Sequence, residues 1–227
     1  MRIVFMGTPE FAVATLRQIV EDGWEVVAAY TQPDKPKNRG MKLIPTPVKE
    51  YAMSVGIPVY QPQSCRDEAT LAQIRSLEPD VILVAAYGKL LPQALLDIPK
   101  VAILNVHSSL LPQYRGAAPI NWAVLNGDAE TGVTIQYMAA ELDAGDILLT
   151  ERTAITDDED AGQLYDRLAL LGGKAASGHF AACRTALPPG HLRCMVPSTS
   201  MPAFFPVRCP PLTGTKTPGP LSIRSGV

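Results

Sequence analysis

The sequence has few of the features that mark a membrane, secreted or metal-binding protein. No apolar run approaches the ~20 residues that a bilayer-spanning helix needs, and the N-terminus reaches Gly7 too early for the apolar core of a signal peptide. The four cysteines fit no common zinc spacing. We therefore expect a cytoplasmic protein that needs neither a membrane partner nor a metal.

Acidic residues are absent from the end of the chain. All 22 of them precede residue 181, whereas 181–227 holds five basic residues and nine of the 21 prolines, with no periodic apolar pattern. Such a segment buries too little surface to offset its ordering entropy. We expect one domain over 1–180 and a tail over 181–227 outside that fold. We hypothesise that the tail is a frameshift or mis-joined coding end; translating the other two frames tests this, and finding no globular continuation would refute it.

Strand-like and helix-like segments alternate along residues 1–180, which indicates an α/β layered sheet. An apolar strand at 3–6 leads into Gly7-Thr8-Pro9, where Thr8 is expected to cap a helix with Pro9 at its first position. This turn lacks the three-glycine spacing of a dinucleotide site, so we do not predict NAD. Further strands are predicted at 25–31, 80–86, 101–106, 131–138 and 146–155, and helices at 48–55, 67–77, 119–125 and 160–179.

Asn105 and His107 form the candidate reaction centre. The apolar run at 101–104 predicts a strand that they close, and a spacing of two places both on one face. A loop with Pro112 and Gly116 follows immediately. In open α/β sheets, ligands bind at the carboxyl ends of the strands. An amide and a titratable imidazole therefore stand where a ligand is expected.

The basic segment 31–49 is predicted to be a long loop with two readings. It carries Lys35, Lys37, Arg39 and Lys42 beside four prolines. It is either a solvated connection or an arm that contacts phosphates, since clustered lysine and arginine bind them without reading a base sequence. The net charge of −2 gives no global basic field, so we expect no DNA partner.

Asp143 also has two readings. An aspartate in the turn Glu141-Leu142-Asp143-Ala144-Gly145 is most often a local capping group. Alternatively, its carboxylate contacts His107 and fixes the tautomer of the imidazole. Spacing along the chain does not decide between them.

Taken together, the motifs resemble the methionyl-tRNA formyltransferases within the folate-dependent formyltransferase family. The matching stretches are Phe5 to Ala12, Thr31 to Asp34 with Arg39-Gly40, Pro45 to Lys49, Ala86-Tyr87-Gly88, Asn105 to Ile120 and Gly127 to Ile135. The resemblance covers residues 1 to about 178. It implies a Rossmann-like formyltransferase fold, with a mostly parallel central sheet and helices on both faces.

The resemblance implies transfer of a formyl group from 10-formyltetrahydrofolate to the α-amine of methionyl initiator tRNA. Asn105, His107 and Asp143 would be catalytic: Asn105 donates to the oxyanion, His107 assists proton transfer, and Asp143 orients His107. The implied folate-binding residues are Tyr87, Gly88, Ser109, Leu110, Leu111 and Pro112. The implied tRNA-binding residues are Lys35, Lys37, Arg39 and Lys42. We expect a monomer.

Two departures from the family pattern bear on function. Glu141 stands where the family commonly has glycine; if that position needs a positive φ, Glu141 would strain the turn that presents Asp143. The family also carries a C-terminal domain of OB type, and nothing after residue 180 resembles it. The alternatives are therefore a truncated folate-binding protein with little or no tRNA formylation, or a formyltransferase acting on a smaller amine.

Overall fold

The computed structural model describes residues 1–37 and 42–186. Its strands are β1 (Arg2–Gly7), β2 (Glu25–Tyr30), β3 (Lys35–Lys37), β4 (Lys42–Ile44), β5 (Val59–Tyr60), β6 (Val81–Ala85), β7 (Ala102–His107), β8 (Glu130–Tyr137) and β9 (Ile147–Ala154). Its helices are α1 (Glu10–Glu21), α2 (Pro47–Ser54), α3 (Glu68–Ser76), α4 (Gln93–Leu96), α5 (Pro119–Leu125) and α6 (Ala161–Ala186). Arg39 and residues 187–227 of the predicted tail lie outside the described residues.

The central sheet has seven strands in the order β5-β2-β1-β6-β7-β8-β9. The strands from β5 to β7 are parallel, and β8 runs antiparallel to both of its neighbours. The predicted mostly parallel sheet is confirmed. The chain moves outward from β1 through β2 to β5, then crosses to β6 on the other side of β1. This reversal is the kind of position where α/β sheets bind ligands.

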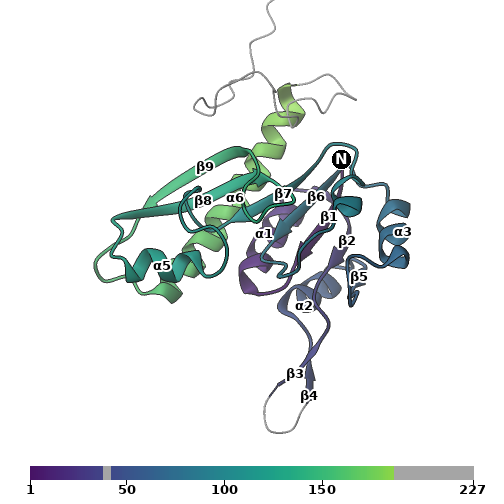
Figure 1. Cartoon of the computed structure of the whole chain (residues 1–227), viewed down its shortest axis with the longest axis horizontal. Coiled ribbons are helices and arrows are strands. Elements are labelled where there is room, and N and C mark those ends of the chain that lie inside the picture. The colour runs from purple at the N-terminus through teal and green to yellow at the C-terminus, as the bar shows by residue number, and fades with distance from the viewer. Residues whose placement is uncertain (38–41, 187–227) are drawn as a thin grey trace, which may run out of the picture.

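Helices cover both faces of the sheet (Figure 1). Each strand points apolar side chains alternately to the two faces, so both faces must be covered. Ile3 and Phe5 of β1 join a core with residues of α1, α2, α5 and α6, whereas Val4 and Met6 join a second core with residues of α3 and α4. Within the described residues, no helix combines the length and the apolar character that crossing a bilayer requires.

The start of α1 differs from the expectation. Pro9, in extended conformation, is the N-cap residue and makes no side-chain cap hydrogen bond. Thr8 instead donates its hydroxyl hydrogen bond to the carbonyl of Tyr87, 3.0 Å away. The prediction that Thr8 caps the helix is therefore wrong, because its hydroxyl is committed to the loop after β6.

The described part of the basic segment contains two strands where the sequence predicts only a loop. β3 and β4 pair as an antiparallel hairpin, with Lys35 opposite Ile44 and Lys37 opposite Lys42. Figure 1 shows this hairpin extending away from the central sheet. At the other end of the described chain, α6 continues to Ala186, past the helix end expected at residue 179.

Candidate active site

A cavity of about 580 Å³ lies at the carboxyl ends of β6 and β7. Its volume falls within the usual range for small-molecule sites. One wall is the loop after β6, and another is the end of β7 with the segment leading into α5. The polar lining residues on the β7 side include Asn105, His107 and Asp143. The structure therefore brings the three predicted catalytic residues together.

The Asp143 carboxylate is held by three hydrogen bonds from separate parts of the chain. Asn105 Nδ2 and Gln136 Nε2 donate to Oδ1, at 3.3 and 2.9 Å, and the Gly116 N–H donates to Oδ2 at 2.8 Å. The side chain is only 8% exposed. Since Asn105 has two amide hydrogens, one remains for a ligand in the cavity.

His107 lies between two acceptors. Its Nε2 is 3.0 Å from the carbonyl oxygen of Tyr114, and its Nδ1 is 3.6 Å from Asp143 Oδ2. A carbonyl can only accept, so Nε2 carries the hydrogen of the first contact. The second distance is longer than a good hydrogen bond. In this tautomer Nδ1 carries the lone pair of the neutral ring and lies beside the Asp143 carboxylate.

The positive φ expected at Glu141 is found instead at Asp143, two residues later in the same turn. Glu141 is not among the described residues with positive φ, whereas Asp143 itself has φ 48°. An aspartate tolerates this left-handed conformation better than most residues. The expectation about Glu141 is corrected: the residue that occupies the left-handed region here is the aspartate.

Gly145 is required by a close backbone approach. A Cβ added to Gly145 would lie 1.8 Å from the carbonyl oxygen of Tyr137, the last residue of β8. The missing side chain lets the turn fold tightly back onto β8. This packing sets the position of Asp143, two residues earlier.

Tyr87 and Gly88, the other predicted folate-binding residues, form part of the opposite wall. Gln32 Nε2 donates to the carbonyls of both residues, at 3.0 and 3.2 Å, and Thr8 donates to Tyr87. Burial raises the pKa of the Tyr87 phenol, whose hydroxyl lies against the sulfur of Cys65. The ring is therefore part of the core, and Tyr87 presents mainly its backbone to the cavity.

Ser109, Leu110, Leu111 and Pro112 are not among the residues that line the cavity. The Ser109 hydroxyl, fully buried, donates to the carbonyl of Gln113 at 2.6 Å, and Thr134 Oγ1 donates to the carbonyl of Ser109 at 2.7 Å. Leu110 and Leu111 are buried. Polar groups of this segment pair with β8 and within their own loop, and contact of these four residues with folate stays a prediction.

The predicted tRNA-binding lysines lie on the hairpin. Lys35 is exposed, and the backbones of Lys37 and Lys42 pair with each other. The base of the hairpin is fixed by an ion pair between Lys49 Nζ and Asp34 Oδ2, 2.5 Å apart. Hydrogen bonds from Lys49 and Gln61 hold the pKa of Asp34 below its usual value.

Gln136 is a site residue that the sequence reading missed. It is 1% exposed, opposes Asn105 across the β7–β8 ladder and donates to Asp143, while its Oε1 has no hydrogen-bond partner. A polar residue inside an apolar strand was the only sign of it, since the pairing register cannot be read from one sequence. Among the described residues, no cluster of three or more histidine, cysteine or acidic side chains could hold a metal ion.

Comparison with known proteins agrees with this geometry. The sequence model described as "Formyl transferase" matches residues 1–177. The chain belongs to the formyl transferase family. Methionyl-tRNA formyltransferases from Geobacter metallireducens and Citrifermentans bemidjiense are 55% and 56% identical to it over 174 residues. These matches cover 77% of this chain but only 56% and 55% of the relatives, so the chain spans about half their length.

Solved structures show that the formyl transferase fold is shared more widely. Phosphoribosylglycinamide formyltransferase from Bacillus halodurans aligns with a TM-score of 0.65 at 23% identity, over 82% of this chain and 97% of that chain. A sugar N-formyltransferase from a Shewanella species aligns with a TM-score of 0.60 at 17% identity, over 80% and 68%. At these identities the likeness shows the fold alone.

Proposed function

We propose that this chain transfers the formyl group of 10-formyltetrahydrofolate to the α-amine of methionyl initiator tRNA. The observation that carries the proposal is the grouping of Asn105, His107 and Asp143 on one cavity wall, in a chain about 55% identical to methionyl-tRNA formyltransferases. Asn105 donates a hydrogen bond to Asp143, and His107 Nδ1 lies 3.6 Å from the same carboxylate. The matched region covers little more than half of these relatives, and the cavity residues lie within it.

In the proposed reaction, the amine nitrogen attacks the formyl carbon to give a tetrahedral intermediate. The free hydrogen of Asn105 Nδ2 donates to the oxygen that becomes negative, which lowers the barrier most where water is excluded. The bond from carbon to the folate nitrogen then breaks, and the proton lost by the amine passes to that nitrogen. His107 Nδ1, beside Asp143, is placed to relay this proton.

The two proposed substrates would bind at different places, the folate in the cavity and the tRNA along the hairpin. The backbone of Tyr87 and Gly88 would face the pterin ring, with Ser108, which lines the cavity, on the β7 side. The hairpin would lie along the acceptor arm of the tRNA, where Lys35, Lys37, Lys42 and Arg39 would contact phosphates. The hydrogen bonds of Gln32 to the Tyr87–Gly88 loop support this arrangement, because they place the base of the hairpin beside the cavity.

The test is formylation by the purified chain. Methionyl initiator tRNA and 10-formyltetrahydrofolate are added, and formylmethionine is released and quantified. We expect transfer that Asn105→Ala and His107→Ala reduce by at least about 10²-fold, while Asp157→Ala, in an exposed loop, keeps the wild-type rate. Folate binding without transfer to tRNA would overturn the proposal, as would transfer to a small amine such as glycinamide ribonucleotide in preference to tRNA.

A further inference from the structure

The hydrogen bond between His107 and the backbone of Tyr114 depends on groups outside the cavity. A neutral imidazole has a single N–H, and His107 has an acceptor on each side: the Tyr114 carbonyl at 3.0 Å and Asp143 Oδ2 at 3.6 Å. The two acceptors compete for one hydrogen. Whichever is better placed decides the tautomer and hence which ring nitrogen carries a lone pair.

Tyr114 presents its carbonyl from an uncommon backbone conformation. Its φ is 56°, which is rare for a residue with a bulky side chain and persists only where the surroundings hold it. The next residues continue the irregular path, with Gly116 at φ 87° and Ala118 at φ 57°. Backbone preference alone therefore does not explain why the Tyr114 carbonyl remains within hydrogen-bond distance of His107.

The side chain of Tyr114 supplies the restraint. Its hydroxyl donates to Asp128 Oδ2 at 2.6 Å and accepts from Asn126 Nδ2 at 2.8 Å. The bond to Asp128 raises the pKa of the Tyr114 phenol. Both partners belong to the turn that ends α5, which Asp128 closes by donating its N–H to the carbonyl of Ala123 at 3.0 Å.

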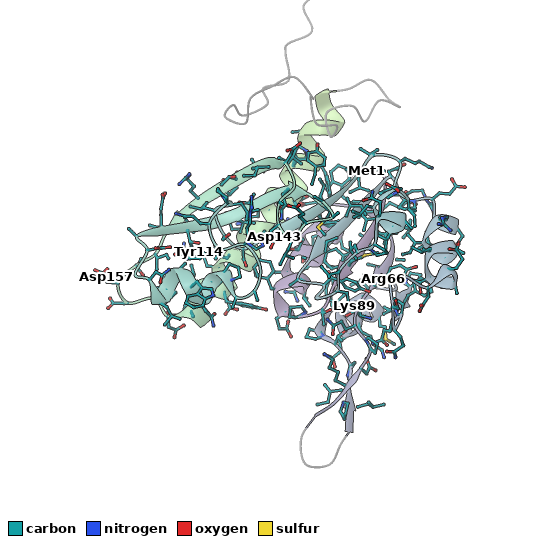
Figure 2. The ribbon with its side chains drawn as sticks, in the orientation of Figure 1. Met1, Arg66, Lys89, Tyr114, Asp143 and Asp157 are labelled. Carbon is teal, nitrogen blue, oxygen red and sulfur yellow. The ribbon has the colours of Figure 1, made fainter. Side chains whose placement is uncertain are left out.

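We propose that Asp128 is a positioning residue for His107 and acts through the side chain and backbone of Tyr114. Asp128 does not line the cavity, so its influence on a reaction there passes through Tyr114. With Tyr114 held, the neutral ring keeps its hydrogen on Nε2 and leaves Nδ1 free as a base. With Tyr114 released, the hydrogen moves to Nδ1 and points at Asp143. In Figure 2, the labels of Tyr114 and Asp143 stand next to each other near the middle of the molecule, and Lys89 marks the loop of the opposite wall.

The experiment reads the tautomer directly by NMR of the ¹⁵N-histidine-labelled chain at alkaline pH. Substitution of His107 by Gln assigns its signals among the three histidines. In the wild-type chain we expect the Nε2–H tautomer to predominate. In Asp128→Ala and Tyr114→Phe we expect the Nδ1–H fraction to rise severalfold. Asp128→Asn, whose side-chain oxygen still accepts from the Tyr114 hydroxyl, should restore the wild-type spectrum, and Asp157→Ala should leave it unchanged.

A kinetic arm rests on the proposed function. Losing one well-placed hydrogen bond should lower kcat for formyl transfer about fivefold to tenfold in Asp128→Ala and Tyr114→Phe, with KM for the folate within twofold of wild type. Wild-type tautomer populations in folded Tyr114→Phe would overturn the inference. Loss of stability in both variants with an unchanged kcat would also overturn it, since Asp128 would then only stabilise the fold. A chain that shows the tautomer change but never formylates tRNA would refute the proposed function alone.

Discussion

Replacing Gly145 with alanine should displace the turn that carries Asp143. The added Cβ would lie 1.8 Å from the Tyr137 carbonyl oxygen, whereas real Cβ contacts essentially never fall below 3.0 Å. The turn and the end of β8 must therefore separate by about 1.2 Å. A misplacement of this size at a catalytic group can cost ~10²-fold in rate. We expect kcat to fall by about that factor.

The same substitution should also lower stability. Inserting a methyl group where backbone must move costs about 1–3 kcal/mol. The matched control is Gly178→Ala on α6, where an added Cβ meets nothing within 4 Å. Because alanine is favoured over glycine inside a helix by ~1 kcal/mol, this control should unfold at a slightly higher urea concentration and keep the wild-type rate.

The measurements are single-turnover formyl transfer and urea unfolding of both variants. Wild-type values in both assays for Gly145→Ala would refute the reasoning, since the turn would then have accommodated a side chain that the packing excludes. A loss of stability with an unchanged rate would show that the position of Asp143 does not depend on how closely Gly145 approaches β8.

Further predictions concern the base of the hairpin, the carboxylate site and the core. The interaction of ionised Asp34 with Lys49 stabilises the folded state above the pH at which a free carboxyl titrates, and this stabilisation is lost as pH falls through the lowered pKa of Asp34. When Tm is measured from pH 7 to pH 2, Asp34→Asn should therefore show a smaller fall in Tm at acid pH than the wild-type chain. Gln136→Leu removes a buried donor to Asp143 and should cost about 1–3 kcal/mol in urea unfolding as well as slowing transfer; an unchanged rate would show that the remaining donors hold the carboxylate in place. Leu168→Ala, at a fully buried position, should cost about 2–5 kcal/mol while leaving the rate of the folded fraction unchanged.

The strands and the long helices could be predicted because their apolar periodicity is strong. The strand ending at His107 was placed within a residue of its observed bounds, and the spacing of Asn105 and His107 correctly put both on one face. The contact between Asp143 and His107 was weighed against a local capping role, and spacing alone left the question open. In the structure the carboxylate lies beside the imidazole, and its hydrogen bonds come from Asn105, Gln136 and Gly116, which are outside its own turn.

The sequence could not predict contacts that depend on the pairing register of the strands or on tertiary hydrogen-bond partners. Gln136 reaches Asp143 only because β8 pairs with β7 in a register that places it opposite Asn105. The local pattern at Thr8 predicts a helix cap, but a tertiary partner, the carbonyl of Tyr87, accepts the hydrogen bond of its hydroxyl. The pairing of Lys37 with Lys42 likewise joins two residues whose like charges gave no sign of a hairpin.

The packing of α6 against α1 bears on how the chain reaches its native state. The first helix of the domain shares one apolar core with the last, so residues near position 11 gain their final neighbours only when residues beyond 161 are available. During synthesis, the core on this face of the sheet therefore stays incomplete until nearly the whole domain has left the ribosome. Such long-range closure slows folding and leaves apolar surface open to association in the meantime. A chain released before α6 is made would expose Phe11 and Leu16 to solvent and would depend on chaperones to stay soluble.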